Sequence, residues 1–316
     1  MFKNTEIISV KGIVMEVIKN EDKIIDKPTA VALGSFDGIH KGHKELINTL
    51  KVNAEKRDLK TGVFTFINHP AKIINEKSFP KLISDNELKI QILNDFGIKY
   101  IYMLDFNKSF MQMSPEEFVK NILVERLKAK LICVGFNYRF GKKGLGDTKK
   151  LNELGKRYGF EVIVIPPVRE NNNIVSSTYI RSLLTDGYIK KANELLERNY
   201  SLKGKVIKGK GIGKEIGFPT ANLNINNKYL IPKPGVYKTY TVIDDKKYLS
   251  VTSIGKNPTF NHNNLSVETH ILDYNKNLYN KTIKIEFLQF LRGVIKFKNK
   301  DELITQIDKD IQSILN

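Results

Sequence analysis

The chain has 316 residues, of which 41% are apolar and 27% charged, a composition typical of folded globular proteins and not of disordered chains. Because this length exceeds what one hydrophobic core usually serves, we expect two domains. The formal net charge of +18 at pH 7 would suit nucleic acid or an acidic membrane. However, the lysines are spread along the whole chain without a dense basic tract. We therefore expect a solvated basic surface, small anionic substrates, and neither nucleic acid nor membrane as a partner.

The sequence contains no export or membrane signal. Residues 1–20 lack the continuous apolar stretch of a signal peptide, and no apolar run approaches the roughly 20 residues of a membrane-spanning helix. Cys133 is the single cysteine, which excludes an intrachain disulfide and a metal site of several cysteines. We expect a cytoplasmic protein whose oligomeric state, a homo-oligomer included, stays open.

Residues 1–185 alternate between predicted strands and helices. An apolar run over 29–33 predicts a buried strand, a glycine-punctuated turn covers 34–38, and a helical pattern begins at about Lys41. Four further strands are predicted at 62–66, 100–104, 131–135 and 161–165. Helices are predicted around Leu88, Ile92, Leu93 and Phe96, at 115–127 behind the N-cap Ser114, between the last two strands, and at 180–184. This alternation predicts a parallel sheet with helices on both faces and ligands at the carboxyl ends of its strands.

From about residue 186 the pattern changes to one helix, at 188–198, followed by glycines, prolines and short strands. Strands at 236–242 and 248–254 flank Asp244-Asp245, which predicts a hairpin. We expect a second pair of strands at 267–272 and 283–290. A last helix places Leu303, Ile307, Ile311 and Leu315 on one stripe. The order predicts a small antiparallel β-barrel with a terminal helix.

Two histidines follow the 34–38 turn. His40 and His43 are three residues apart at the start of a helix, so they share a face. A helix N-terminus suits phosphate, and neutral imidazoles can donate hydrogen bonds to charge that builds on a phosphate during reaction. Two alternatives compete. The pair could bind zinc, although no third ligand is evident nearby and Gly42 is a poor helix former, or both could be ordinary, partly buried histidines.

The stretch from Gly34 to His43 resembles the His-x-Gly-His signature of the nucleotidyltransferase superfamily, whose members transfer AMP or CMP from a nucleoside triphosphate. The resemblance implies a Rossmann-like domain. It also implies ATP contacts from Gly34, Phe36, Asp37, His40, Gly42 and His43. The run Ser176-Ser-Thr-Tyr-Ile-Arg181 resembles the second signature, which contacts ATP phosphates and implies the same for Ser177, Thr178 and Arg181. By residue type alone, these hydroxyls would simply cap a helix.

Two loops narrow the resemblance. Thr65-Phe-Ile-Asn-His-Pro70 and Val134–Gly141 are together similar to stretches of the FMN adenylyltransferase module of bacterial FAD synthetases. That similarity implies flavin contacts from His69, Asn137 and Arg139. The chain departs from the family pattern at three positions: Asn68 stands where proline is usual, Asn137 where aspartate is usual, and Ser35 where asparagine is frequent.

The second half contains a glycine-rich run, in which Gly209, Gly211 and Gly213 would let the backbone approach a phosphate closely. It is not a Walker A loop, because Gly213-Lys214 is followed by Glu215. Thr220 and Asn222 supply two neutral oxygens two residues apart, which suits Mg²⁺ beside nucleotide phosphates.

The stretch Gly217-Phe-Pro-Thr-Ala-Asn222 resembles the riboflavin kinase signature. The resemblance implies Mg²⁺ at Thr220 and Asn222, general-base and flavin-binding roles for Glu268, and a flavin contact from Arg292. It implies kinase ATP contacts from Gly209, Gly211, Gly213, Pro219, Thr220 and Asn222. By residue type alone, Glu268 would be a surface glutamate on an edge strand. Val294 and Ile295 depart from the charged residues usual after Leu291-Arg292.

The resemblance covers nearly the whole chain and is to the bifunctional bacterial riboflavin kinase/FMN adenylyltransferase family. It implies an adenylyltransferase domain over 1–185 and a kinase domain over 186–316. Riboflavin would be phosphorylated by ATP to FMN, and a second ATP would convert FMN to FAD, with His40, His43 and Arg181 stabilising the transition state. Two alternatives stay open: a nucleic-acid-binding protein with a degenerate nucleotidyltransferase domain, and a flavin sensor with one inactive domain.

Overall fold

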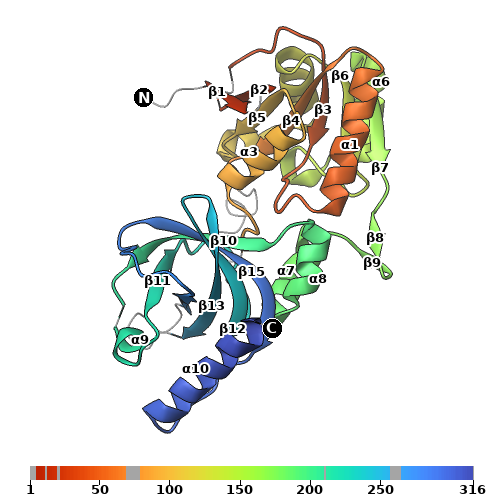
Figure 1. Cartoon of the computed structure of the whole chain (residues 1–316). Helices are drawn as coiled ribbons and strands as arrows, with labels where there is room; N and C mark the ends of the chain where they lie inside the picture. Colours follow the sequence, from red (N-terminus) through yellow and green to blue (C-terminus); the bar gives the residue numbers. More distant parts are fainter. Residues whose placement is uncertain are drawn as a thin grey trace. The chain divides into compact units, whose positions relative to one another are not determined.

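The computed structural model describes residues 5–10, 13–19, 22–68, 79–209, 211–256 and 265–315. The chain divides into two compact units. The first comprises Met1–Pro80 and Asp85–Val175, and the second comprises Lys81–Ser84 and Ser176–Asn316. Figure 1 shows both units. No helix in the described part of the chain is both long and apolar enough to cross a membrane.

The first unit is built on a sheet that, in the described residues, has seven strands in the order β1-β2-β5-β4-β3-β6-β7. Strands β2 to β7 pair in parallel, and β1 pairs antiparallel with β2. The strands are β1 Thr5–Val10, β2 Ile13–Ile18, β3 Thr29–Leu33, β4 Lys60–Phe66, β5 Tyr100–Leu104, β6 Ala129–Gly135 and β7 Glu161–Ile165. The predicted parallel sheet is confirmed, and β1 and β2 add two strands that lie outside the elements predicted from the sequence.

Helices cover both faces of this sheet. Alternate residues of β3 point to opposite faces, so Ala30 and Ala32 pack with α1 (Lys41–Glu55) and α3 (Asn86–Asp95). Val31 and Leu33 belong to the core on the other face, below the remaining elements. These are α4 Lys108–Gln112, α5 Pro115–Glu117, the π-helical η1 Phe118–Arg126, the 3₁₀ turn η2 Lys142–Gly144 and α6 Thr148–Tyr158. A short hairpin, β8 Arg169–Glu170 and β9 Asn173–Ile174, completes the unit.

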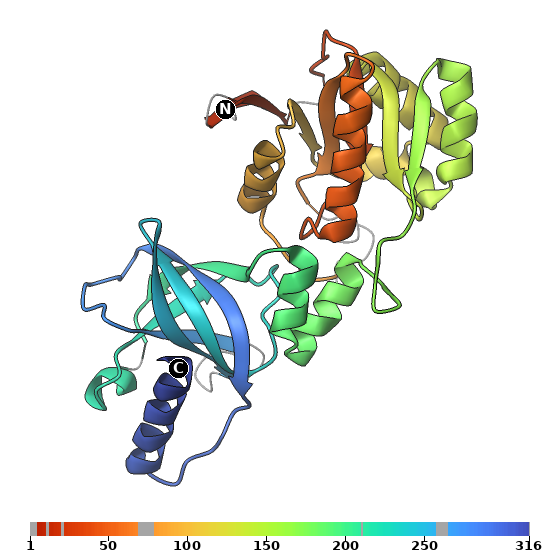
Figure 2. The same ribbon diagram turned by 45° about the vertical axis from the view of Figure 1, so that its right-hand side comes forward.

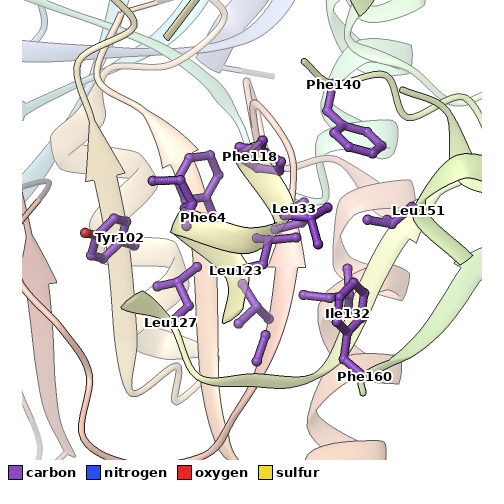
Figure 3. Close-up of a cluster of buried hydrophobic side chains, with 14 of the residues drawn as sticks. Leu33, Phe64, Tyr102, Phe118, Leu123, Leu127, Ile132, Phe140, Leu151 and Phe160 are labelled. Carbon is purple, nitrogen blue, oxygen red and sulfur yellow. The ribbon is translucent and has the colours of Figure 1, made fainter. Parts of the chain in front are cut away.

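Large apolar side chains hold η1 and α6 on the sheet. Figure 3 shows Leu33, Phe64 and Tyr102 of the strands gathered with Phe118 and Leu123 of η1. Each such burial contributes roughly 1.5–3 kcal/mol. The predicted helix over 115–127 forms, with the Ser114 side chain accepting the Glu117 N–H in a capping box. Most of its length is π-helical and not α-helical.

The second unit is a closed antiparallel barrel, in the described residues, with the strand order β10-β11-β14-β13-β12-β15. The strands are β10 Tyr200–Ile207, β11 Thr220–Ile225, β12 Gly235–Ile243, β13 Lys246–Lys256, β14 Leu265–Ile271 and β15 Thr282–Arg292. The predicted hairpin is confirmed, because β12 pairs with β13 through Asp244 and Asp245. Both aspartates have positive φ, of 48° and 62°, as tight hairpin turns require.

Both strands of the second expected pair form, but the expectation that they pair with each other is wrong. β14 lies between β11 and β13, and β15 lies between β10 and β12, so the two do not pair with each other. Closing a barrel requires the last strand to pair with the first, and this requirement overrides closeness in the sequence.

Helices flank the barrel in this unit. They are α7 Ser177–Asp186, α8 Ile189–Leu196, the short α9 Ile212–Glu215 and the terminal α10 Lys300–Leu315, and Figure 2 shows α10 from the side. The predicted stripe of α10 fails at its end, because Leu315 is 58% exposed while Ile314 is buried. Each four-residue step advances about 40° beyond a full turn, so the stripe drifts off the packed face after three steps.

Candidate active sites

The strand order of the first sheet indicates where a ligand would bind. From β3 the chain runs through β4 to β5 on one side, and then returns to β6 and β7 on the other side of β3. In open parallel sheets, ligands bind outside the carboxyl ends of the strands where this order reverses. The turn after β3 and the loop after β6 both lie at that point. His40 ends the turn and His43 lies in the first turn of α1. Asn137 and Arg139 lie on the loop after β6.

The turn between β3 and α1 has an unusual backbone. Phe36 and Ile39 have positive φ values of 49° and 37°, and Gly38 has a φ of 85°. Non-glycine residues rarely adopt this region, so packing must hold the turn. Phe36 and Ile39 are fully buried, and Asp37 is 3% exposed. The turn is thus a rigid element beside the start of α1.

The two histidines stack on one another. His40 is the N-cap residue of α1, and the His40 and His43 ring centroids are 3.8 Å apart with an 18° angle between the planes. Phe36 packs on the second ring, with centroids 5.2 Å apart. A Cβ at Gly42 would lie 3.2 Å from Cε1 of His40, which explains a glycine inside a helix here. The expected shared face is confirmed.

A zinc site at these histidines gains no support. Among the residues that the structure describes, no group of three or more His, Cys, Asp and Glu side chains could hold a metal ion. The two stacked imidazoles at a helix start are instead suited to donating hydrogen bonds to an anion.

Two of the predicted flavin residues, Asn137 and Arg139, lie on the loop after β6, at the same edge of the sheet. Asn137 and Arg139 follow β6 and are exposed, with an Arg139 nitrogen 3.9 Å from Asp147. His69 lies outside the described residues. Its neighbour Asn68 donates to the Phe106 carbonyl at 3.0 Å and accepts the Phe106 N–H at 2.8 Å. Asn68 therefore ties the loop after β4 to the loop after β5, which proline could not do.

The second signature lies on α7, in the second unit. Helix α7 begins at Ser177, three residues earlier than predicted, and the Ser176 side chain caps it by accepting the Tyr179 N–H at 3.2 Å. The capping interpretation therefore applies to Ser176, while Ser177 and Thr178 are in the first turn. Arg181 is half-buried, and its Nε donates to the Lys81 carbonyl at 2.8 Å.

Residues predicted for the kinase site meet across two barrel strands. Asn222 on β11 lies directly opposite Glu268 on β14, and Thr220 lies opposite His270. Directly opposed residues point to the same face. Thr269 is buried in the barrel interior, where it accepts from Thr252 at 2.9 Å. Alternation thus places Glu268 on the outer face beside Asn222, and β14 is not an edge strand, because it pairs on both sides.

The glycine-rich loop packs against the side chains of Thr220 and Asn222 on β11. A Cβ at Gly209 would lie 2.3 Å from Nδ2 of Asn222, and one at Gly213 would lie 2.4 Å from the Phe218 carbonyl and 3.2 Å from Oγ1 of Thr220. Gly211 is exposed, with a φ of 81°. Glycine at 209 and 213 is therefore required for the loop to approach the Thr220–Asn222 strand.

A pocket of about 150 Å³ adjoins this strand. Pro219 and Thr220 form part of its wall, and the segment 274–279 faces them. Further wall residues are Val206, Ala221, Thr269 and Ile271. His270 of β14 reaches the same segment, because its Nδ1 lies 2.8 Å from the Pro219 carbonyl oxygen. The pocket meets the Asn222–Glu268 pair only through β11, since Thr220 lines the pocket while Asn222 and Glu268 do not.

Comparison with known proteins decides the family. Residues 22–179 match the FAD synthetase family and residues 196–316 match the riboflavin kinase family. The bifunctional riboflavin kinase/FMN adenylyltransferase of Listeria monocytogenes is 38% identical over 295 residues, 92% of this chain and 93% of that protein. The same enzyme of Bacillus subtilis is 36% identical over 292 residues, 91% of this chain and 92% of that protein. This chain belongs to the bifunctional riboflavin kinase/FMN adenylyltransferase family.

A solved structure supports the fold over the full length. A Streptococcus pneumoniae protein described as a macrolide-efflux protein matches with a TM-score of 0.85 at 34% identity, covering 95% of this chain and 98% of that one. The Rossmann-like domain and the barrel are therefore shared by that structure.

Two features of the sites were not predicted from the sequence. Arg292, a predicted flavin contact, has its guanidinium on Asp310 of α10, with Nε–Oδ1 at 2.9 Å and the NH2 group 2.7 Å from Oδ2. Lys89 of α3 is buried against the turn after β3 and donates to the Ser35 carbonyl at 3.0 Å. Neither contact has a local sequence signal, because each joins segments far apart in the chain.

Proposed function

We propose residue roles for the two activities of this family. The chain is an ATP-dependent enzyme that phosphorylates riboflavin to FMN and adenylylates FMN to FAD. The observation that carries the roles in the kinase is the register of β11 and β14, which sets Asn222 opposite Glu268. Neither the nucleic-acid-binding nor the flavin-sensing alternative is favoured by the matches to both enzyme families.

In the kinase site, Glu268 is the general base. Its carboxylate takes the proton of the ribityl 5′-hydroxyl, and that oxygen attacks the γ-phosphorus of ATP. The bond between the γ-phosphorus and the bridging oxygen breaks, and ADP leaves. Such transfers depend mainly on positioning and on charge stabilisation. The loop glycines 209, 211 and 213, together with Pro219, lie over the phosphates, and the pocket beside Thr220 takes part of the nucleotide.

Thr220 and Asn222 would hold Mg²⁺. Both carry a neutral oxygen, and their alternation on β11 puts the two side chains on one face. Neutral oxygens together with ATP phosphates suit this ion, which usually keeps few protein ligands. When bound, it neutralises phosphate charge. Gly209 packs closely against the Asn222 amide, so that a Cβ there would lie 2.3 Å from Nδ2.

In the adenylyltransferase site, a phosphate oxygen of FMN attacks the α-phosphorus of ATP, and the bond to the β-phosphate oxygen breaks to release pyrophosphate. No enzyme nucleophile takes part. His40 and His43 donate to the oxygens on which charge builds, and Gly34, Phe36, Asp37 and Gly42 shape the turn that receives ATP. Ser177, Thr178 and Arg181 stay predicted contacts of ATP phosphates.

Further assignments remain proposals of the same kind. His69, Asn137, Arg139, Glu268 and Arg292 are the proposed flavin contacts. We place the functional boundary between residues 185 and 186, a position that lies between the two family matches. We propose that the enzyme works in the cytoplasm and without nucleic acid.

The first prediction tests Glu268. Glutamine has nearly the shape of glutamate but cannot accept the hydroxyl proton, so Glu268→Gln should lower the riboflavin kinase rate about 10²–10⁴-fold. The assay is incubation with riboflavin, ATP and Mg²⁺, followed by chromatography for FMN and FAD. Supplied with FMN, the variant should form FAD at the parent rate. Glu194→Gln, on the exposed side of α8, is the matched control. Riboflavin phosphorylation within a few-fold of the parent would rule out the base role.

A further inference from the structure

Lys89 is a buried ionisable group that neither reaction above uses. It lies on α3 and is 6% exposed. Its Nζ donates to the carbonyl oxygen of Ser35 at 3.0 Å. The hydroxyl of Thr65, on β4, donates to the same oxygen at 3.1 Å. One carbonyl of the turn after β3 is therefore held from two elements distant in the sequence.

A carboxylate of the turn faces this lysine. Asp37 is 3% exposed, two residues after Ser35, and its charge attracts the ammonium. Burial lowers the pKa of Lys89 to about 8, and the attraction of Asp37 opposes that shift. Buried charges persist only where they are compensated and hydrogen-bonded. The lysine thus compensates the one carboxylate of the turn.

The turn that Lys89 holds is the one that places the histidines. Phe36 and Ile39 are both in the left-handed region of the backbone, an unfavourable conformation that survives only when the surroundings over-determine it. The Phe36 ring packs on His43. A displacement of the turn would therefore move the imidazole ring as well.

We propose that Lys89 is a positioning residue for adenylyl transfer, whose ammonium fixes the turn through the Ser35 carbonyl and cancels the charge of Asp37. The inference rests on the proposed role of this turn in receiving ATP. Without the ammonium, the negative charge of Asp37 would lose the attraction of Lys89 beside the proposed triphosphate site, and the binding of ATP would weaken more than the binding of FMN.

The first test is Lys89→Met, which keeps the length of the side chain and removes the charge. Since small displacements of a positioned group cost up to about 10²-fold, we expect kcat/KM for ATP in FAD formation to fall about tenfold to hundredfold. The loss should lie mainly in KM for ATP, with KM for FMN unchanged. The kinase rate of the same sample reports that the chain is folded and at the stated concentration.

Lys99→Met is the matched control. Lys99 also donates from Nζ to a backbone carbonyl at 3.0 Å, but this carbonyl belongs to Val14 of β2 and not to the turn after β3. The Lys99→Met variant should keep both activities within twofold of the parent. If Lys89→Met keeps the parent KM for ATP, or loses affinity for FMN and ATP equally, the proposal is overturned.

The second test measures pH dependence, first in the parent enzyme, where the absence of a fall near pH 8 would already contradict the proposal, and then in Lys89→Met. With Lys89 charged only below about pH 8, kcat/KM for ATP should fall as the pH rises through that value, and this limb should be missing in Lys89→Met. The charge that acts on it from the turn is Asp37, and on its own helix Asp85 is the N-cap residue and Glu87 lies in the first turn. A limb that persists in the variant would contradict the proposal, whereas failure of the parent to form FAD would refute the proposed function instead.

Discussion

At the scale of residues, burying the charged form of Lys89 lowers the stability of the folded state. The pKa of its ammonium is lowered from 10.5 to about 8 by burial, so the folded state resists the charged form. Between pH 8 and 10.5 the unfolded chain binds the proton that the folded chain has released. The stability of the folded state therefore rises with pH over this window, and the contribution is absent from Lys89→Met.

The expected size is about 3 kcal/mol, from 1.36 kcal/mol for each pKa unit. The measurement is denaturant unfolding of the parent and of Lys89→Met at pH 7.5, 9 and 10. The difference in unfolding free energy should move in favour of the parent as the pH rises. Parallel pH curves for the two proteins would show that Lys89 is not held against its charged form.

At the scale of elements, a buried ion pair helps to hold α10 to the barrel. Arg292 of β15 places its fork on Asp310, which also accepts from Gln306 at 3.0 Å. An apolar cluster around Ile314 and Val251 and a hydrogen bond from Lys238 to the Ile314 carbonyl at 2.7 Å also link the helix to the barrel. Loss of the ion pair would leave a half-buried guanidinium without its carboxylate.

Asp310→Ala should lower the unfolding free energy of the barrel by about 3–5 kcal/mol, the usual effect of removing one partner of a buried pair. Thermal unfolding, followed by circular dichroism, measures it, because kinase activity would also respond to a displaced Arg292. Asp308→Ala, at an exposed position of the same helix, should change stability by no more than about 0.5 kcal/mol. Equal effects of the two substitutions would mean that the ion pair contributes nothing beyond a surface charge.

At the scale of the whole molecule, Glu268 and His43, the residues proposed to act in the two reactions, lie in different compact units, although Arg181 of α7 belongs to the same unit as Glu268. Each reaction has its own ATP and its own transition state, and FMN is the product of one and the substrate of the other. The two activities should therefore be separable by single substitutions.

His43→Ala should lower FAD formation from FMN about 10²–10³-fold, the typical cost of losing one donor to a transition-state oxygen, and leave riboflavin phosphorylation intact. An equimolar mixture of His43→Ala and Glu268→Gln should convert riboflavin to FAD after a lag, through FMN released into solution. Chromatographic time courses test this. FMN accumulation without FAD in the mixture, although Glu268→Gln alone adenylylates added FMN, would contradict the expectation.

Local patterns by themselves determined much of this protein. The strands at 29–33, 100–104 and 161–165 form with the predicted bounds, because short apolar runs between turns specify buried parallel strands. The helix from Lys41 buries the expected Leu46, Ile47, Leu50 and Ala54. The motifs that carry the family resemblance could likewise be identified from the sequence, since each is a contiguous run of residues.

Only the tertiary structure decided which distant segments meet. The face of α3 was expected at Leu88, Ile92, Leu93 and Phe96, yet its buried residues are Lys89, Leu93 and Asn94. From the sequence alone, a lysine is expected to be exposed to solvent. Lys89 can be buried because a carbonyl and a carboxylate compensate its charge, and both belong to a turn more than 50 residues away. The pairing of β15 with β10 and the Arg292–Asp310 fork have the same origin, because barrel closure and charge compensation depend on contacts that local periodicity does not encode.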